Sequence, residues 1–127
     1  MLSNFCCSLG FCFYHLEQAR SAWNLTSVEF GKLLKRYNLV SNLLASKETL
    51  ELEPSAVVRK ELEGYLLSNG CKSFKGTHAV SMLPYPLDGA SILKYELLFR
   101  MTMDAYGYTV DEAMSYLYMK DLFSCSR

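Results

Sequence analysis

The chain has 127 residues, enough for one hydrophobic core, and half of them are apolar. Thirteen basic and thirteen acidic residues give a formal net charge of zero, so the overall charge provides no attraction to nucleic acid or to an anionic membrane. Only a fifth of the residues are charged, and glycine and proline are few. This composition excludes a disordered or collagen-like chain.

The first predicted element is a helix over residues 4–23. Its apolar residues recur at steps of three and four, and Glu17, Gln18 and Arg20 are expected on its outer side. The apolar run from Phe5 to Tyr14 is too short to span a membrane, and no basic residue precedes it as in a signal peptide. The five cysteines are an odd number without a repeating spacing. Together these features predict a reducing, cytoplasmic location.

Three further helices are predicted in the first half of the chain. Thr26 and Glu29 have the spacing of a capping box, which predicts a helix over residues 27–37. An apolar run predicts a short helix over residues 39–45, and a polar, acidic connector follows it. Pro54 suits a first helical position and begins a helix over residues 54–68.

Between Cys71 and Pro86 the helical period disappears. Two short stretches, residues 72–75 and 77–83, are separated at Gly76 and have the length of strands. We therefore predict a small irregular or two-stranded β patch near residues 71–83.

Residues 88–106 are predicted to form the central helix. Glu96, Arg100 and Asp104 are spaced four residues apart on one stripe, and nearly all other side chains are apolar. A helix that is apolar over most of its circumference is usually buried, so we expect solvent only along the charged stripe.

A short link and a second capping-box spacing at Thr109 precede a last helix over residues 110–123. The short link predicts that the last two helices form an antiparallel hairpin. The predicted fold is thus mainly α: a compact single-domain multi-helix bundle over residues 1–127 with a C-terminal helical hairpin.

No residue pattern in the sequence makes a complete catalytic site. Cys71 and His78 would need an orienting group and an oxyanion donor to act together. Buried thiols usually pack as small hydrophobic groups, and the nearest set of zinc ligands is incomplete. We therefore predict a protein that is not an enzyme and has no metal, cofactor or small-molecule substrate. The sequence leaves open whether a metal is held by Cys6, Cys7, Cys12 and His15.

The favoured function is that of a non-catalytic adaptor or regulatory protein that binds a protein partner, or a second copy of itself, through helix faces. Tyr116, Met119 and Leu122 project away from the stripe of the last helix that faces the core. Tyrosine and methionine are enriched in interfaces, and a helix that is apolar on two faces needs two partners. We therefore predict the partner contact at these three residues. A basic strip is expected to steer an acidic partner, and it consists of Lys32, Lys35 and Arg36.

The alternative is a winged-helix-like DNA-binding transcriptional regulator with a C-terminal dimerisation hairpin. The order of a helix, a short helix, a helix and a glycine-containing two-strand patch agrees with that architecture. The would-be reading helix, however, carries Glu61 and Glu63, and acidic side chains oppose the phosphate contacts that dominate such affinity. In this alternative the nucleic-acid contacts are Lys35, Arg59, Lys60, Lys72 and Lys75.

Overall fold

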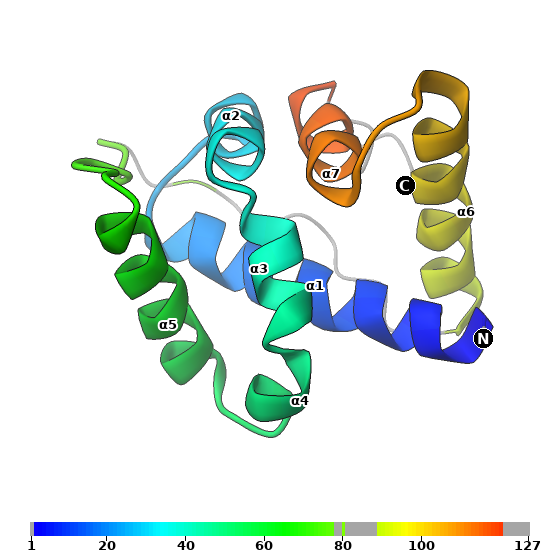
Figure 1. Cartoon of the computed structure of the whole chain (residues 1–127), viewed down its shortest axis with the longest axis horizontal. Helices are drawn as coiled ribbons and strands as arrows, with labels where there is room; N and C mark the ends of the chain where they lie inside the picture. Colours follow the sequence, from blue (N-terminus) through cyan, green and yellow to red (C-terminus); the bar gives the residue numbers. More distant parts are fainter. Residues whose placement is uncertain (1, 78–79, 81–88, 121–127) are drawn as a thin grey trace.

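The computed structural model describes residues 2–77, 80 and 89–120, with side chains described from Gly10 onward and again from Leu93. Within these residues the chain forms helices and no strand, so the predicted mainly α, compact multi-helix fold is confirmed (Figure 1). None of the helices in this part of the chain is both long and apolar enough to cross a membrane. The helices are α1 (Leu2–Ala22), α2 (Ser27–Tyr37), α3 (Leu39–Ala45), α4 (Lys47–Leu50), α5 (Ser55–Ser68), α6 (Gly89–Tyr106) and α7 (Val110–Met119).

Both predicted capping boxes are present and fix where α2 and α7 begin. The Glu29 amide donates to Thr26 Oγ1 at 3.2 Å, and the Thr26 amide donates to Glu29 Oε1 at 2.9 Å. Thr109 and Glu112 exchange the same two hydrogen bonds before α7. Each box satisfies amide groups that a helix N-terminus otherwise leaves unpaired.

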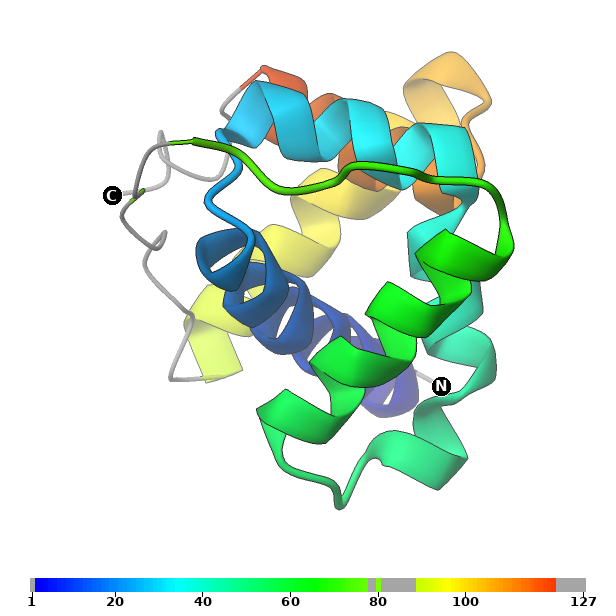
Figure 2. The same cartoon turned by 90° about the vertical axis from the view of Figure 1, so that its left-hand side faces the viewer.

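The central pairing of the fold is between α2 and α7, which lie side by side in two perpendicular views (Figures 1 and 2). Ser115 Oγ on α7 donates to the Gly31 carbonyl on α2 at 2.6 Å. A Cβ atom at position 31 would lie 2.9 Å from the Ser115 carbonyl oxygen, so the close approach depends on glycine.

The predicted antiparallel hairpin of α6 and α7 is not confirmed. In Figure 1, α6 stands upright while α7 is viewed nearly along its axis. The turn at Gly107, with φ +65°, joins them, and the last helix takes α2 as its main neighbour.

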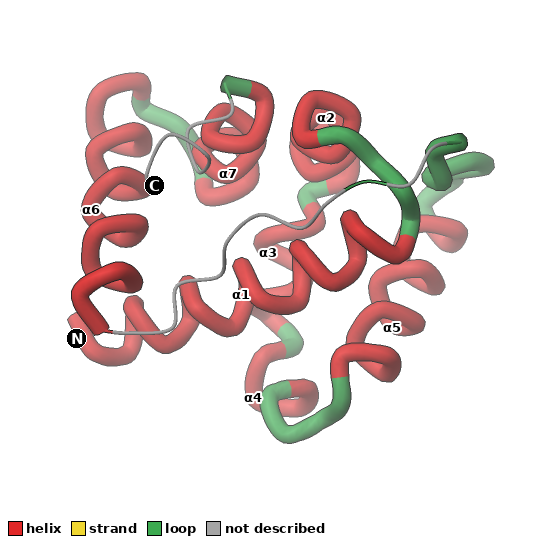
Figure 3. Tube along the Cα trace, turned by 180° about the vertical axis from the view of Figure 1, so that it is seen from behind, coloured by secondary structure: helices red, strands yellow, loops and turns green. Residues whose placement is uncertain are grey.

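The connections differ from the prediction in two places. Residues 47–50 form the one-turn helix α4, where a polar connector was expected. Residues 71–76 run as an open, extended trace beside α2 in Figure 2, and the chain bends at Thr77. None of these residues forms a strand, so the two-stranded patch is not supported there, and its remaining positions 78–79 and 81–83 lie outside the described residues. The Gly76 amide instead donates to the carbonyl of Trp23, at the turn that follows α1, at 2.7 Å. Figure 3 shows the path of the chain from behind.

The prediction that Glu17 and Arg20 face solvent was wrong. Both are buried, with exposed fractions of 0% and 3%. The Arg20 guanidinium donates to both Glu17 carboxylate oxygens at 2.8 and 3.0 Å, and to the Leu25 carbonyl at 3.0 Å. Tyr118 on α7 donates to Glu17 Oε2 at 2.7 Å, and burial raises the pKa of Tyr118 well above its ordinary value. This paired and hydrogen-bonded arrangement allows the charges to be buried.

The burial predicted for the central helix was also wrong. Glu96 is buried in α6, and Tyr95 and Phe99 also face the interior. The hydrophobic side chains that are more than half exposed on the opposite face include Leu93, Leu97 and Met101. A helix with apolar residues all round has no preferred apolar side, so tertiary packing selected the face with the aromatic rings.

A buried aspartate ties the start of α3 to α7. Asp111 Oδ1 accepts hydrogen bonds from the Val40 amide at 2.7 Å and the Ser41 amide at 3.0 Å, and its Oδ2 accepts one from the Ser41 hydroxyl. Asn38 occupies the N-cap position of α3 but makes no side-chain capping bond. Asp111 therefore acts as the cap from a distant part of the sequence.

Candidate functional site

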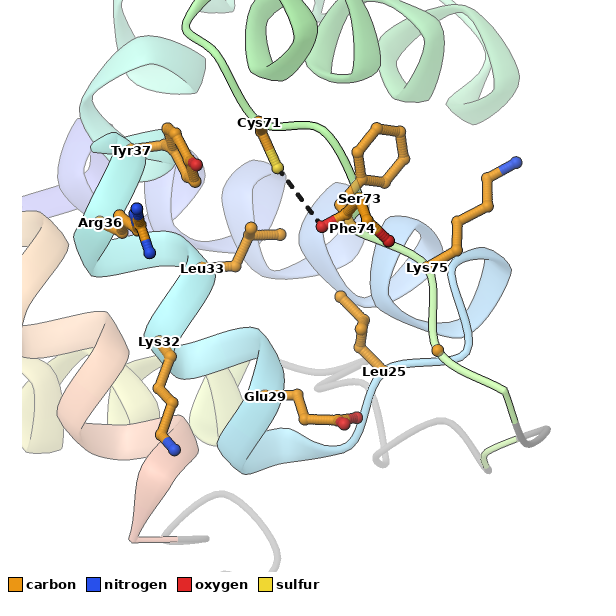
Figure 4. Close-up of a pocket in the computed structure, with 11 residues that line it drawn as sticks. Leu25, Glu29, Lys32, Leu33, Arg36, Tyr37, Cys71, Ser73, Phe74 and Lys75 are labelled. Atoms are coloured by element: carbon orange, nitrogen blue, oxygen red, sulfur yellow. Dashed lines mark hydrogen bonds between the residues drawn. The ribbon is translucent and has the colours of Figure 1, made fainter.

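A groove of about 330 Å³ runs between α2 and the extended segment 71–76 (Figure 4). Its floor is apolar: Leu25 is buried, Leu33 is half-buried, and both lie between the two walls. Exposed cations stand on both walls, with Lys32 and Arg36 on α2 and Lys75 on the segment. The remaining lining residues are Glu29, Tyr37, Cys71, Ser73, Phe74 and Gly76.

The helical period of α2 generates the first wall. The residues that line the groove from α2 are spaced three or four apart and therefore form one face. The fully buried Phe30 and Leu34 lie on the neighbouring face, toward the core. Packing of α2 on α7 thus leaves the charged face turned toward the segment. The residues of that face are Glu29, Lys32, Leu33, Arg36 and Tyr37.

The second wall is an extended segment fixed at both ends. The Cys71 amide donates to the Leu66 carbonyl at the end of α5 at 3.0 Å, and the Gly76 amide is bonded to Trp23. The Phe74 ring contacts the Trp23 ring edge-on, with centroids 4.9 Å apart. A side chain at Gly76 would collide with the backbone carbonyl of Asn24. The segment is therefore held in place against the turn between α1 and α2.

The charge of the groove is mainly positive. Within the described residues, Lys32, Arg36 and Lys75 form no ion pair. The Arg36 guanidinium lies 5.7 Å from the centre of the Tyr37 ring. The Glu29 carboxylate also borders the groove, where it caps α2. Three cations thus line the groove together with one carboxylate, Glu29, which has a structural role as a helix cap.

The residues predicted as the main partner contact have neighbours within the chain. Met119 lies against the backbone of Gly31 on α2 and is 37% exposed. Tyr116 is half-buried, and its ring lies 5.1 Å from that of Tyr106 and 5.9 Å from that of Tyr108. Leu122 lies outside the described residues. Much of the second apolar side of α7 is thus met by α2 and by these tyrosines, which the sequence argument missed.

The residues predicted for nucleic-acid contact are not gathered at one place. Lys75 lines the groove, and Lys72 on the same segment and Lys35 on α2 are exposed but do not line it. Arg59 on α5 pairs with Glu63 at 3.6 Å. Lys60 lines a separate cleft of about 440 Å³ between α3, α4 and α5.

The thiols and histidines do not form a reactive cluster in the described part of the chain. No group of three metal-ligating side chains is present there, although the side chains of Cys6 and Cys7, and all of His78, lie outside it. Burial raises the pKa of Cys12 to about 12, so its thiol keeps its proton and is a poor ligand or nucleophile. Burial lowers the pKa of His15.

Sequence reasoning found the cations of the α2 wall but missed the groove itself. Phe74, which lines the second wall, was assigned to a strand. The sequence did show that the helical period ends after Cys71. This loss of period indicates an irregular segment, but it does not indicate which part of the protein the segment contacts. Comparison with protein-family models, curated proteins and solved structures gives no match.

Proposed function

We propose that this protein is a non-catalytic adaptor or regulatory protein that binds an acidic segment of a protein partner in the groove between α2 and residues 71–76. The observation that carries the proposal is the set of exposed cations that line both walls beside an apolar floor, with Lys32 and Arg36 on α2 and Lys75 on the segment. We expect the protein to act in the cytoplasm, where its cysteines would stay reduced.

Charge complementarity selects the occupant. Exposed cations that form no ion pair in the described part of the chain attract carboxylates, raise the association rate and suppress binding of basic partners. The apolar floor adds a place for one aliphatic or aromatic side chain, and burying such a side chain contributes about 1.5–3 kcal/mol. An acidic peptide with apolar residues between its carboxylates satisfies both parts of the groove.

A nucleic-acid backbone fits the same groove less well. It offers a continuous row of phosphates and would leave the apolar floor without a contact. Arg59 is already engaged by Glu63, and residues 71–77 form no strand that would serve as a wing. We therefore do not propose DNA binding.

The test is a binding titration with a defined probe. The probe is a synthetic ten-residue peptide of alternating glutamate and leucine, with a blocked C-terminus and a fluorescent dye on its N-terminus. Its binding is measured by fluorescence anisotropy at low ionic strength. The variant Lys32→Glu plus Arg36→Glu should weaken binding about tenfold or more, because it reverses the charge of one wall. Circular dichroism of each variant checks that it is folded.

A matched control separates the groove from the overall charge. Lys60→Glu plus Lys120→Glu alters the net charge by the same amount at exposed positions outside the groove. It should change the affinity about twofold at most. Equal losses in the two variants, or no binding of the peptide by the unmodified protein, would reject the groove as the site. Tighter binding of duplex DNA than of the peptide at equal charge would favour the nucleic-acid hypothesis instead.

A further inference from the structure

We infer that the bound acidic segment pairs as an extended strand with the main chain of residues 72–75, so that binding completes a two-stranded β ladder beside α2. The inference rests on the proposed function and specifies how the partner is recognised. It follows from the hydrogen bonds that the second wall makes and from the length of that wall.

The middle of the segment offers main-chain groups for pairing. Its main-chain hydrogen bonds within the described part of the chain are made at its two ends, by the amides of Cys71 and Gly76. Between these ends, the contact to a main-chain group is the Cys71 thiol on the Ser73 carbonyl, at 3.6 Å. Lys72, Ser73 and Lys75 are exposed. An extended chain with unpaired amides and carbonyls is a template for strand addition.

The two walls have matching lengths. The lining face of α2 runs from Glu29 to Tyr37, about 12 Å at a rise of 1.5 Å per residue. Residues 72–75 cover about 13 Å at the rise of an extended strand. A partner segment of about four residues therefore lies alongside both walls over their whole length.

Strand addition also predicts a sequence pattern in the partner. Successive side chains of a strand point to opposite faces, so alternate residues would enter the apolar floor beside Leu25 and Leu33. The others would stay at the rim, near Lys32, Arg36 and Lys75. The fixed ends at Cys71 and Gly76 hold the template extended before binding, which limits the ordering that binding requires.

The experiment compares two isomers of the alternating peptide described above. In one isomer every glutamate amide is N-methylated, and in the other every leucine amide. The N–H groups of successive residues in a strand point to opposite edges, and those of every second residue share one edge, so methylation blocks the paired edge in one isomer only. The two isomers have the same mass, charge and number of methyl groups, so each is the control of the other.

We expect one isomer to bind about tenfold or more weakly than the other. We also expect every second amide in residues 72–75 to become protected from hydrogen exchange when the unmethylated peptide binds. Similar affinities of the two isomers, with no added protection, would overturn strand pairing and leave the groove as a site read by side chains alone. Failure of the unmethylated peptide to bind would instead reject the proposed function.

Discussion

Replacement of Glu17 by glutamine should destabilise the protein strongly, because it removes the charge partner of a buried arginine. Arg20 is only 3% exposed, and its guanidinium donates to both Glu17 carboxylate oxygens. After Glu17→Gln the guanidinium would lose the carboxylate charge and keep, among the contacts described above, the hydrogen bond to the Leu25 carbonyl and one to the amide oxygen. The glutamine NH₂ group would point a donor at Arg20 or at Tyr118.

The expected loss is about 3–5 kcal/mol of the free energy of unfolding, the usual result of breaking a buried ion pair from one side. That is a large part of the total stability of a domain of this size. Urea unfolding at pH 7, followed by circular dichroism, measures it. The matched control is Glu51→Gln, which breaks the exposed pair with Lys47 and should lose about 1 kcal/mol at most. If both variants lose the same small amount of unfolding free energy, the buried ion pair does not stabilise the fold as inferred here.

Three further predictions concern single side chains. Asp111→Ala removes the cap of α3 and should lower the free energy of unfolding by about 1–3 kcal/mol in the same urea assay, since the buried Val40 amide loses its acceptor; unchanged stability would contradict the capping role. Gly64→Ala should stabilise the protein by about 0.5–1 kcal/mol, because a Cβ atom there has open space in a helix. Gly76→Ala should destabilise it by about 1–3 kcal/mol, because the Cβ atom meets the backbone of Asn24. The reversed order of stability would refute the packing of the second wall. Burial lowers the pKa of His15, so as the pH falls below about 6.5 the unfolded chain binds a proton at this histidine before the folded protein does. The wild type should therefore lose stability relative to His15→Leu between pH 7 and 5. Parallel curves of stability against pH for the two proteins would contradict this.

The parts of the fold that follow from local chemistry were predictable from the sequence. The helices at residues 27–37 and 39–45 have the predicted bounds. The helix predicted over 54–68 begins one residue later, at Ser55, and the central helix predicted over 88–106 spans Gly89–Tyr106. Capping boxes and proline positions act within a few residues, so the sequence contains their whole cause.

The errors arose where the deciding partner is far away in the sequence. Glu17 and Arg20 look like solvent-facing charges until Tyr118 is brought onto them from α7. The burial of Glu96 in α6 likewise depends on which side of an almost uniformly apolar helix meets its neighbours. The same limit applies to the candidate site. Its cations on α2 were found from the sequence, but the opposite wall required knowing that Gly76 bonds to Trp23.

The most direct measurement is an NMR titration of the isotope-labelled protein with the alternating glutamate–leucine peptide. We expect the largest shift changes in the amides of residues 29–37 and 71–76, with smaller changes along α5 and α6. Largest changes on the exposed face of α6 around Leu97, which is 59% exposed, would contradict the assignment of the groove. So would saturating peptide that leaves every amide signal unmoved.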